Sequence, residues 1–255
     1  MQGVWINKKG EKYPTRQGYE IEIIEYIRHN NCTIRFNDER CTILYNIRYD
    51  HIKSGSVSNP YHLSVFDIGY LGIGVYTVKI NKKTSLCYRV WSDMLRRCYS
   101  EKHQNNNITY IGCDVTEEWK CFQNFAEWYY ENYDSNIMCK WQLDKDILIK
   151  GNNIYSPENC CFVPQEINNL FTKTNSKRGE YPIGVSLHRE GKFQAFMSVN
   201  NKQKYFGLYK TIQEAFQVYK TEKEKYIKET ADKWKGLISK KVYEVMYNYK
   251  VEITD

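Results

Sequence analysis

The sequence lacks any apolar run of about 18 residues, the length at which a stretch becomes a candidate membrane-spanning helix. Its first residues, MQGVWINKKGEKYP, also lack the apolar core of a secretion signal. We therefore expect no membrane partner, no export and a cytoplasmic location. The composition, with 42% hydrophobic and 26% charged residues, is typical of a globular protein.

The spacing of the cysteines excludes the commonest structural zinc sites. The chain has nine cysteines, an odd number, and no two of them form a C-x-x-C pair. In a reducing compartment the free thiol is the usual state of cysteine. Several of these cysteines occupy apolar positions of a repeating pattern, where the residue packs as a small hydrophobe. The sequence therefore predicts buried thiols rather than a zinc site.

The excess of positive over negative charge is confined to the C-terminal quarter of the chain. The whole chain has a net charge of +7, and residues 177–241 hold 15 Lys and Arg against 7 Asp and Glu, a net +8. The rest of the chain therefore has a net charge of −1. A local basic excess indicates a polyanion partner, most often nucleic acid. The alternative is a solvated helix that carries lysines on one face.

The first 80 residues predict a small β-barrel or meander. The stretches YEIEIIEYI and CTIRF are alternating or β-branched, and NDER before CTILY is a turn signal. Three glycines follow in GYLGIG, at positions 69, 72 and 74. They lack the strand, helix and lysine that accompany the glycines of a phosphate loop, so they predict turns rather than a nucleotide site.

Residues 85–176 change to a helical period. Trp91 and Leu95 lie on one helix face, and TEEWKCFQNFAEWYYENY at 116–133 repeats the pattern with Thr116 as its N-cap. We interpret both apolar stripes as core. Next, WQLDKDILI predicts a strand, KGNNIYSPEN a loop, CCFVP a second strand and QEINNLFTK a short helix.

Residues 177–241 predict three antiparallel strands backed by one helix. The stretches YPIGVSL, KFQAFMSV and QKYFGLY alternate, and the helix begins at a capping box formed by Thr211 and Glu214. Alternation assigns one face of the middle strand to the core, through Phe193, Ala195, Met197 and Val199. The last residues, 242–255, form a tail with no predicted role. Together these parts predict the α+β class.

The C-terminal pattern resembles the Apetala/ERF-type DNA-binding domain of plant transcription factors and of phage and mobile-element nucleases. The resemblance runs from about Tyr181 to Trp234, in IGVSLHREGKFQAFMSV and YFGLYKTIQEAFQVYK. In that family the exposed face of the sheet lies in the major groove of DNA. The resemblance implies ten DNA-contacting residues, with the lysines near phosphates: Ser186, His188, Arg189, Lys192, Gln194, Phe196, Ser198, Lys202, Lys204 and Tyr205. Plant members have several arginines on this face where this chain has Ser186, His188 and Ser198, so their base preference does not carry over.

The stretch LDKDILIKGNNIYSPENCCFVPQEINN, residues 143–169, resembles the HNH or ββα-metal endonuclease core. The family pattern is Asp-His at the end of a strand, Asn before the second strand, and His or Asn on the helix. Asp144-Lys145, Asn159 and Asn168 take these places. The resemblance implies Mg²⁺ or Mn²⁺ held by Asp144 and Asn168, where the ion stabilises a scissile phosphate, with Asn159 orienting the catalytic base or bracing the loop.

The usual catalytic histidine is missing from this stretch. Lys145 stands in its place, and a lysine with its ordinary pKa of about 10.4 is mostly protonated at neutral pH. Burial lowers the pKa of a lysine, but Asp144 and Asp146 beside it raise that pKa again. Either Asp146, His103 or another group acts as the base, or the chain does not cut DNA.

Both resemblances together, over about residues 88–234, are typical of phage and prophage proteins related to HNH homing endonucleases. The first hypothesis is a double-stranded DNA-binding protein that is also a metal-dependent endonuclease. The second is a scaffold without catalysis that binds DNA as a regulator. The third is a counter-defence protein that docks on a host nuclease or a CRISPR effector, through a surface rich in the aromatic residues that make up 15% of the chain. Each would act in the cytoplasm of a bacterial host.

Overall fold

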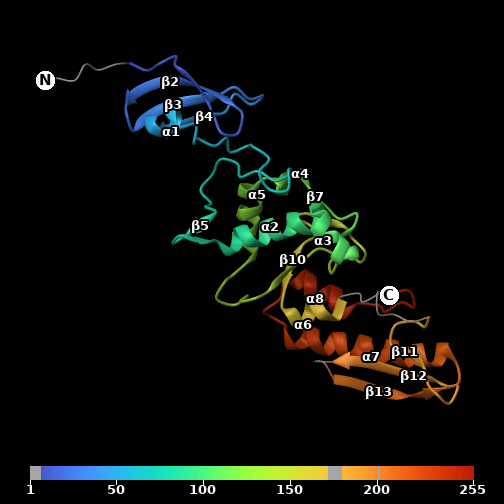
Figure 1. Cartoon of the computed structure of the whole chain (residues 1–255). Helices are drawn as coiled ribbons and strands as arrows, with labels where there is room; N and C mark the ends of the chain where they lie inside the picture. The colour runs from blue at the N-terminus through green and yellow to red at the C-terminus, as the bar shows by residue number, and fades with distance from the viewer. Residues whose placement is uncertain (1–6, 172–179, 200–201) are drawn as a thin grey trace. The chain divides into compact units, whose positions relative to one another are not determined.

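The structure, a computed structural model, contains antiparallel sheets near both ends of the chain, with helices between and after them (Figure 1). It describes residues 7–171, 180–199 and 202–255. The predicted α+β class is confirmed. Seven of the nine cysteines are buried, as the sequence predicted, and Cys41 and Cys139 are exposed. None of the helices in these described ranges has the length and apolar character needed to cross a membrane.

The chain divides into two compact units. The first consists of Met1–Thr109 and Glu117–Glu127, and the second of Tyr110–Thr116 and Trp128–Asp255. The finer division at 1–80, 85–176, 177–241 and 242–255 stays a prediction, and its boundary after residue 176 lies outside the described residues.

The first unit opens with an antiparallel meander, the form that the sequence predicted. Its elements follow one another in space as in sequence: β1 (Lys12–Pro14), β2 (Glu20–Arg28), β3 (Asn31–Phe36), β4 (Ile43–Ile47) and the short helix α1 (Tyr49–Lys53). Alternation at the start of β2 buries Ile21 and Ile23 and leaves Glu20 exposed and Glu22 half-buried. The buried isoleucines pack with Phe36 and related side chains into a core under the sheet.

The glycines of GYLGIG let the chain pass close to Cys121 and Gln123. Gly72 has a φ of +74°, and a Cβ there would lie 2.6 Å from the Sγ of Cys121. Gln123 then holds the segment through Tyr76, whose N–H donates to Oε1 and whose carbonyl accepts from Nε2, both at 3.0 Å. The glycines therefore serve packing.

The helical part of the first unit is broken where the sequence predicted one helix. Its elements are β5 (Lys79–Ile80), β6 (Lys83–Thr84), α2 (Leu86–Tyr99), α3 (Glu101–Asn106), α4 (Glu117–Lys120) and α5 (Phe122–Asn132), which crosses into the second unit. The single helix predicted at 116–133 is wrong because Tyr70 pairs with Cys121: the Tyr70 N–H donates to the Lys120 carbonyl at 3.0 Å and the Phe122 N–H donates to the Tyr70 carbonyl at 2.9 Å. Helix α4 does begin directly after the predicted N-cap Thr116, but the buried Thr116 hydroxyl makes no capping hydrogen bond.

The second unit begins with a strand, loop, strand and helix. A 3-10 turn at Ile108–Tyr110 leads into it, and its first elements are β7 (Asp114–Val115), β8 (Gln142–Asp144), β9 (Ile154–Tyr155), β10 (Cys161–Val163) and α6 (Gln165–Phe171). Strands β8 and β10 pair antiparallel, and β7 pairs parallel with β9. Phe162 of β10 packs against Trp128, Tyr129 and Tyr133. We call the β8, β10 and α6 arrangement, with its connecting loop, the ββα motif.

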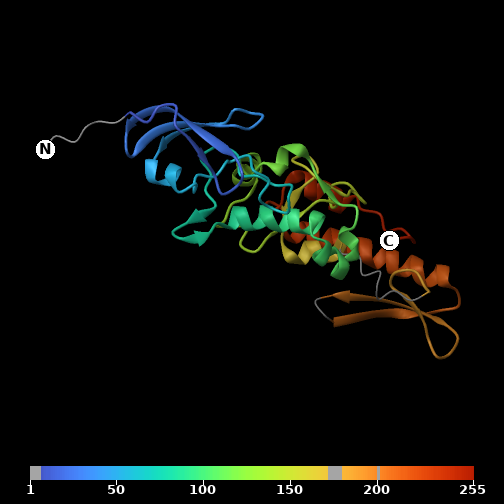
Figure 2. The same ribbon diagram turned by 45° about the horizontal axis from the view of Figure 1, so that its top comes forward.

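A three-stranded sheet with a long helix across one face completes the second unit (Figures 1 and 2). Its elements are β11 (Val185–Leu187), β12 (Phe193–Val199), β13 (Lys202–Tyr209), α7 (Ile212–Lys233) and α8 (Lys240–Tyr247). The predicted capping box is confirmed at Thr211 and Glu214. Gly184, with φ +76°, lies directly against the Tyr219 ring, where no Cβ would fit.

The tail that had no predicted role is part of this core. Residues 240–247 form α8, and Val251 is buried with Ala195, Met197 and Phe216. The Val251 N–H donates to a Glu224 carboxylate oxygen at 2.9 Å. The tail therefore closes the core between α7 and the sheet.

Candidate nucleic-acid interface and ββα motif

Strand register divides the side chains of the C-terminal sheet between two faces. Ala195 pairs with Gly207 and Val185, and these residues point toward α7, where Ala195 and Val185 are buried. Directly paired residues of an antiparallel sheet lie on the same face, and successive residues alternate between faces. The other face, which we call the outer face, carries seven residues: Ser186, Gln194, Phe196, Ser198, Gln203, Tyr205 and Leu208.

An irregularity in the register fixes which residues of β13 belong to the outer face. Phe196 pairs with Tyr205, but its neighbour Ala195 pairs with Gly207, so Phe206 is an extra residue on β13. Phe206 packs with the core, and Leu208 then returns to the outer face opposite Gln194. The sequence pattern missed Leu208 because simple alternation does not foresee this extra residue. It also missed Gln203, which lies two residues before Tyr205 and opposite Ser198.

Polar and aromatic side chains occupy the outer face in pairs. Gln194 Nε2 donates to Ser186 Oγ at 2.6 Å. Phe196 and Tyr205 lie side by side on neighbouring strands, and Tyr205 is 54% exposed. Five of the predicted contact residues therefore come together on one face: Ser186, Gln194, Phe196, Ser198 and Tyr205.

Two of the predicted phosphate-contacting lysines lie on the opposite face. Lys202 pairs with Val199 and Lys204 with Met197, so both start from the face that α7 covers. The Lys204 Nζ lies 3.9 Å from a Glu222 carboxylate oxygen on α7 and 5.5 Å from the centre of the Phe206 ring. They flank the sheet rather than joining the outer face.

The turn between β11 and β12 holds the other predicted contacts. The His188 N–H donates to the Lys192 carbonyl at 2.7 Å, which closes the turn. Arg189 and Lys192 are exposed, and the Lys192 Nζ lies 3.8 Å from Glu190. The turn therefore presents cations at one end of the sheet.

The basic excess of residues 177–241 lies outside the long helix. Helix α7 has five lysines and five acidic residues, so its net charge is zero. Ion pairs at 3.2 Å and 4.0 Å join Lys220 to Glu224 and Lys225 to Glu229 along it. Between Glu180 and Lys210, by contrast, the sequence has five basic residues and two acidic ones. Helix α7 alone therefore does not account for the excess, of which residues 180–210 hold +3 and residues 234–241 hold another +3.

In the ββα motif, Asp144 holds the loop that follows β8. Its Oδ1 accepts hydrogen bonds from the N–H groups of Asp146 at 2.9 Å and Ile147 at 2.8 Å. Burial, and then the charge of Asp146, raise the pKa of Asp144 to about 6. This carboxylate supports the backbone turn in the way that capping residues support a helix.

Lys145, in the place of the family's histidine, is buried and already has partners. Only 7% of the residue is exposed. Its Nζ donates to the Asn152 carbonyl at 3.1 Å and to Asp146 Oδ2 at 3.3 Å, and lies 5.9 Å from the centre of the Tyr155 ring. Asn152 in turn donates from Nδ2 to the Lys145 carbonyl at 2.6 Å. The side chain therefore joins the two ends of the loop.

The two predicted asparagines lie at separate points of the motif. Asn168, on α6, donates from Nδ2 to Gln142 Oε1 at 2.9 Å, and Gln142 precedes Asp144 by two residues on the same side of β8. Asn159 lies in the turn before β10, where its N–H donates to Ser156 Oγ at 3.2 Å. His103 lies in α3 of the first unit, where burial and the charges of Arg96 and Arg97 lower its pKa.

These residues fit a divalent ion poorly. Mg²⁺ binds mainly through carboxylate oxygens and water, and the predicted site offers two carboxylates, Asp144 and Asp146. One oxygen of Asp144 already accepts from two amides, and Asp146 lies beside the Lys145 ammonium. Within the described residues, no group of three or more His, Cys, Asp and Glu could hold a metal ion. The metal and the cleavage activity stay predictions.

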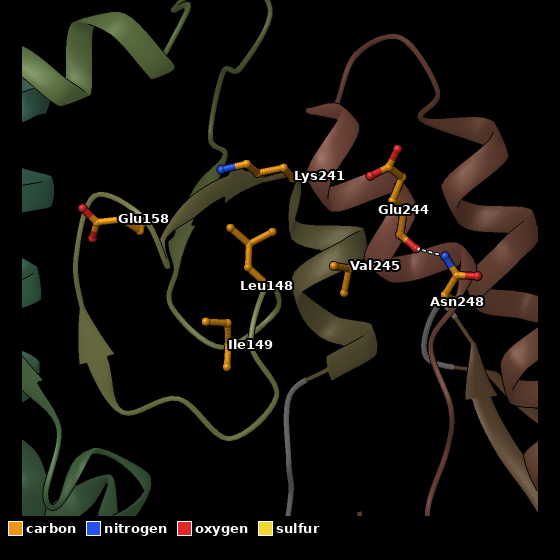
Figure 3. A pocket seen from close by; sticks show the side chains of 7 residues that line it. All are labelled: Leu148, Ile149, Glu158, Lys241, Glu244, Val245 and Asn248. Atoms are coloured by element: carbon orange, nitrogen blue, oxygen red, sulfur yellow. Dashed lines mark hydrogen bonds between the residues drawn. The ribbon is translucent and has the colours of Figure 1, made fainter.

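A hollow of about 430 Å³ lies beside the motif but does not include its predicted catalytic residues (Figure 3). Leu148 and Ile149 from the loop and Val245 from α8 give it an apolar floor. Its rim carries Glu158, Lys241, Glu244 and Asn248. Neither Asp144 nor Asn168 lines it, so this hollow is separate from the predicted metal site.

Comparisons with known proteins do not assign the chain to a family. A scan against protein-family models, a search of curated proteins and a search of solved structures each find no match. The fold class is α+β, and both family resemblances stay predictions. The geometry of the outer face and of the ββα motif is therefore the basis for a functional conclusion.

Proposed function

We propose that the chain binds double-stranded DNA through the outer face of its C-terminal sheet. One observation carries the proposal: the sheet has one face on α7, while Ser198, Gln203 and Tyr205 on the other are exposed. The major groove of B-DNA is about 12 Å wide and admits a β-ribbon, so the strands can approach base edges while the helix stays outside.

The charges around the sheet support this assignment. Arg189 and Lys192 lie at the β11–β12 turn, and Lys210 follows β13. These exposed cations flank the uncharged outer face. Phosphates flank the base edges of a duplex in the same way, and lysine or arginine contacts to them supply most of the non-specific affinity.

Binding of the whole chain to a fluorescent 20-base-pair duplex, measured by anisotropy over a salt series, tests the proposal. We expect binding at about 50 mM salt that weakens steeply as salt rises. Tyr205→Ala is expected to weaken binding about tenfold, because it removes an exposed ring from the centre of the interface. Tyr45→Ala is the matched control, since Tyr45 is also an exposed tyrosine on a strand, at 66%, but belongs to the N-terminal sheet. Absence of duplex binding at low salt would overturn the proposal.

A second candidate function is metal-dependent DNA cleavage at the ββα motif. The observation that favours it is the order β8, loop, β10 and α6, with Asn168 joined to the strand that carries Asp144. Incubation with supercoiled plasmid and Mg²⁺ or Mn²⁺ tests it. Nicking that Asp144→Asn abolishes would support cleavage, and intact plasmid alongside tight duplex binding would favour the binding function alone. Docking on a host nuclease or a CRISPR effector stays a prediction that co-purification tests.

A further inference from the structure

The outer face has no charged side chain. Its seven residues are two carboxamides, two serines, two aromatic rings and one leucine. In the major groove, guanine is commonly read by Arg or Lys at O6 and N7, and cytosine by Asp or Glu at its amino group. Asn or Gln reads adenine at N6 and N7, and apolar groups contact the thymine methyl. The chemistry of this face therefore matches A·T pairs better than G·C pairs.

Gln194 is held in one orientation for such a contact. One hydrogen of its Nε2 donates to Ser186 Oγ at 2.6 Å. The second Nε2 hydrogen and the Oε1 oxygen are the donor and acceptor that adenine N7 and N6 require. Fixing the amide before binding reduces the entropy lost when the complex forms.

Apolar groups lie next to this carboxamide. Leu208 is directly opposite Gln194, and Phe196 follows Gln194 by two residues on the same face. Across the major groove of an A·T pair, adenine presents N7 and N6, and thymine then presents O4 and its methyl group. The Gln194 amide can therefore face the adenine edge while an apolar neighbour faces the methyl group.

We propose that the outer face reads A·T pairs, with Gln194 on adenine and Phe196 on a thymine methyl. This inference rests on the proposed binding of duplex DNA and names the sequence class that the same face prefers. Arg189 and Lys192 lie in the turn outside the outer face and serve the phosphates, which carry no sequence information.

Selection from a random duplex pool, followed by base analogues in the selected site, tests the inference. We expect A·T enrichment over the two or three positions that the strands cover. Replacing one adenine by 7-deazaadenine removes only N7, and is expected to weaken the wild type about fivefold or more. Replacing thymine by uracil removes only the methyl, and is expected to weaken it about fourfold.

Matched variants assign each loss to a residue. Gln194→Ala is expected to lose the sensitivity to 7-deazaadenine, and Phe196→Ser the sensitivity to uracil, while Ser198→Ala on the same strand and face keeps both. Gln194→Arg is expected to move the preference at one position from adenine to guanine, a gain that misfolding cannot imitate.

The outcomes separate this inference from the proposed function. Duplex binding without A·T enrichment and without sensitivity to either analogue overturns the inference and leaves DNA binding intact. Tighter binding of the single strand than of the duplex also overturns it, and indicates a stacking surface made by Phe196 and Tyr205. If no duplex binds at low salt, the proposed function and the inference both fail.

Discussion

The ββα motif and the C-terminal sheet differ in what their polar side chains contact. In the motif, Asp144 accepts from two backbone amides and the Lys145 ammonium lies between Asn152 and Asp146. On the sheet, Ser198 and Tyr205 project from a covered core toward the surface. A polar group with internal partners contributes to the fold, whereas one that a rigid scaffold presents at the surface is available to a ligand.

This difference changes the weight of the two resemblances. Both rest on residue types at characteristic spacings. For the sheet, the structure brings five of the ten implied contact residues to one face, whereas in the motif it gives Asp144 and Lys145 structural partners. The motif also lacks the family's catalytic histidine and has the buried Lys145 in its place. Both observations favour DNA binding over DNA cleavage as the proposed function.

The largest effect is expected from Lys145→Ala. The change removes a buried stem and leaves the Asn152 carbonyl without its ammonium donor, so we expect the unfolding free energy to fall by about 2–4 kcal/mol. Urea denaturation of the purified chain measures this. Ser198→Ala, at an exposed position of β12, is the control and should stay within about 0.5 kcal/mol. If Lys145→Ala kept the full unfolding free energy but lost plasmid nicking, Lys145 would instead be a catalytic group.

Substitutions of Asp144 test whether its carboxylate supports the fold or binds a metal ion. Asp144→Ala removes the acceptor of two amides and should cost about 1–3 kcal/mol of unfolding free energy. Asp144→Asn keeps an Oδ1 acceptor and removes the charge. Since burial raises the pKa of Asp144 to about 6 from an ordinary value of 3.8, the folded state prefers the neutral carboxyl.

The sign of the pH effect follows from this raised pKa. The stabilisation from the protonated carboxyl is fully present below about pH 4 and is lost as pH rises through 6. Asp144→Asn should therefore match the wild type at pH 4 and exceed it by on the order of 1–3 kcal/mol at pH 7. Equal stability of the two proteins at pH 7 would contradict the structural role. Loss of plasmid nicking in the same variant would support the metal site.

Local patterns predicted the parts of the fold that depend on neighbours in sequence. Alternation assigned Ala195 and Met197 to the core, and the spacing of Thr211 and Glu214 located the start of α7. The break at Cys121 could not be predicted in this way, since its cause is a pairing with Tyr70, 51 residues earlier in the chain. Long-range contacts of this kind override local propensity.

The candidate site shows the same limit. Gln194, Phe196 and Tyr205 follow from alternation, and the structure places them together. The position of Lys204 depends on the register of a neighbouring strand and on Glu222 of α7, which no local pattern contains. The roles of Asp144 and Lys145 could not be predicted, because they depend on which backbone amides and carbonyls of the folded loop contact the two side chains.

A second lysine, the half-buried Lys223, contrasts with Lys145. Lys223 of α7 faces a small hollow with Tyr219, Tyr249 and Asp255 as its titratable neighbours, and Asp255 also pairs with Lys150 at 2.6 Å. Burial lowers the pKa of Lys223 to about 8, although Asp255 opposes the shift. The unfolded chain therefore binds more protons between pH 8 and about 10.4.

Stability is accordingly expected to rise with pH across that window. Lys223→Met should stabilise the chain by about 1–2 kcal/mol at pH 7, and the difference should vanish near pH 10.5. Thermal unfolding at several pH values measures it, with Lys225→Met at an exposed position of the same helix as the control. A difference that stays constant with pH would assign the effect to packing rather than to the charge.

The smallest effect is expected from single lysines around the outer face, and it tests the assignment of faces directly. Lys192→Ala, in the turn that flanks the outer face, should reduce the slope of log affinity against log salt by about 0.9 and weaken duplex binding a few-fold. Lys204→Ala should change both quantities less, because Lys204 starts from the α7 side and pairs with Glu222. Anisotropy over a salt series measures both variants. If Lys204→Ala had the larger effect, the duplex would lie along the edge between β13 and α7, and the outer face would lose its role as the reading surface.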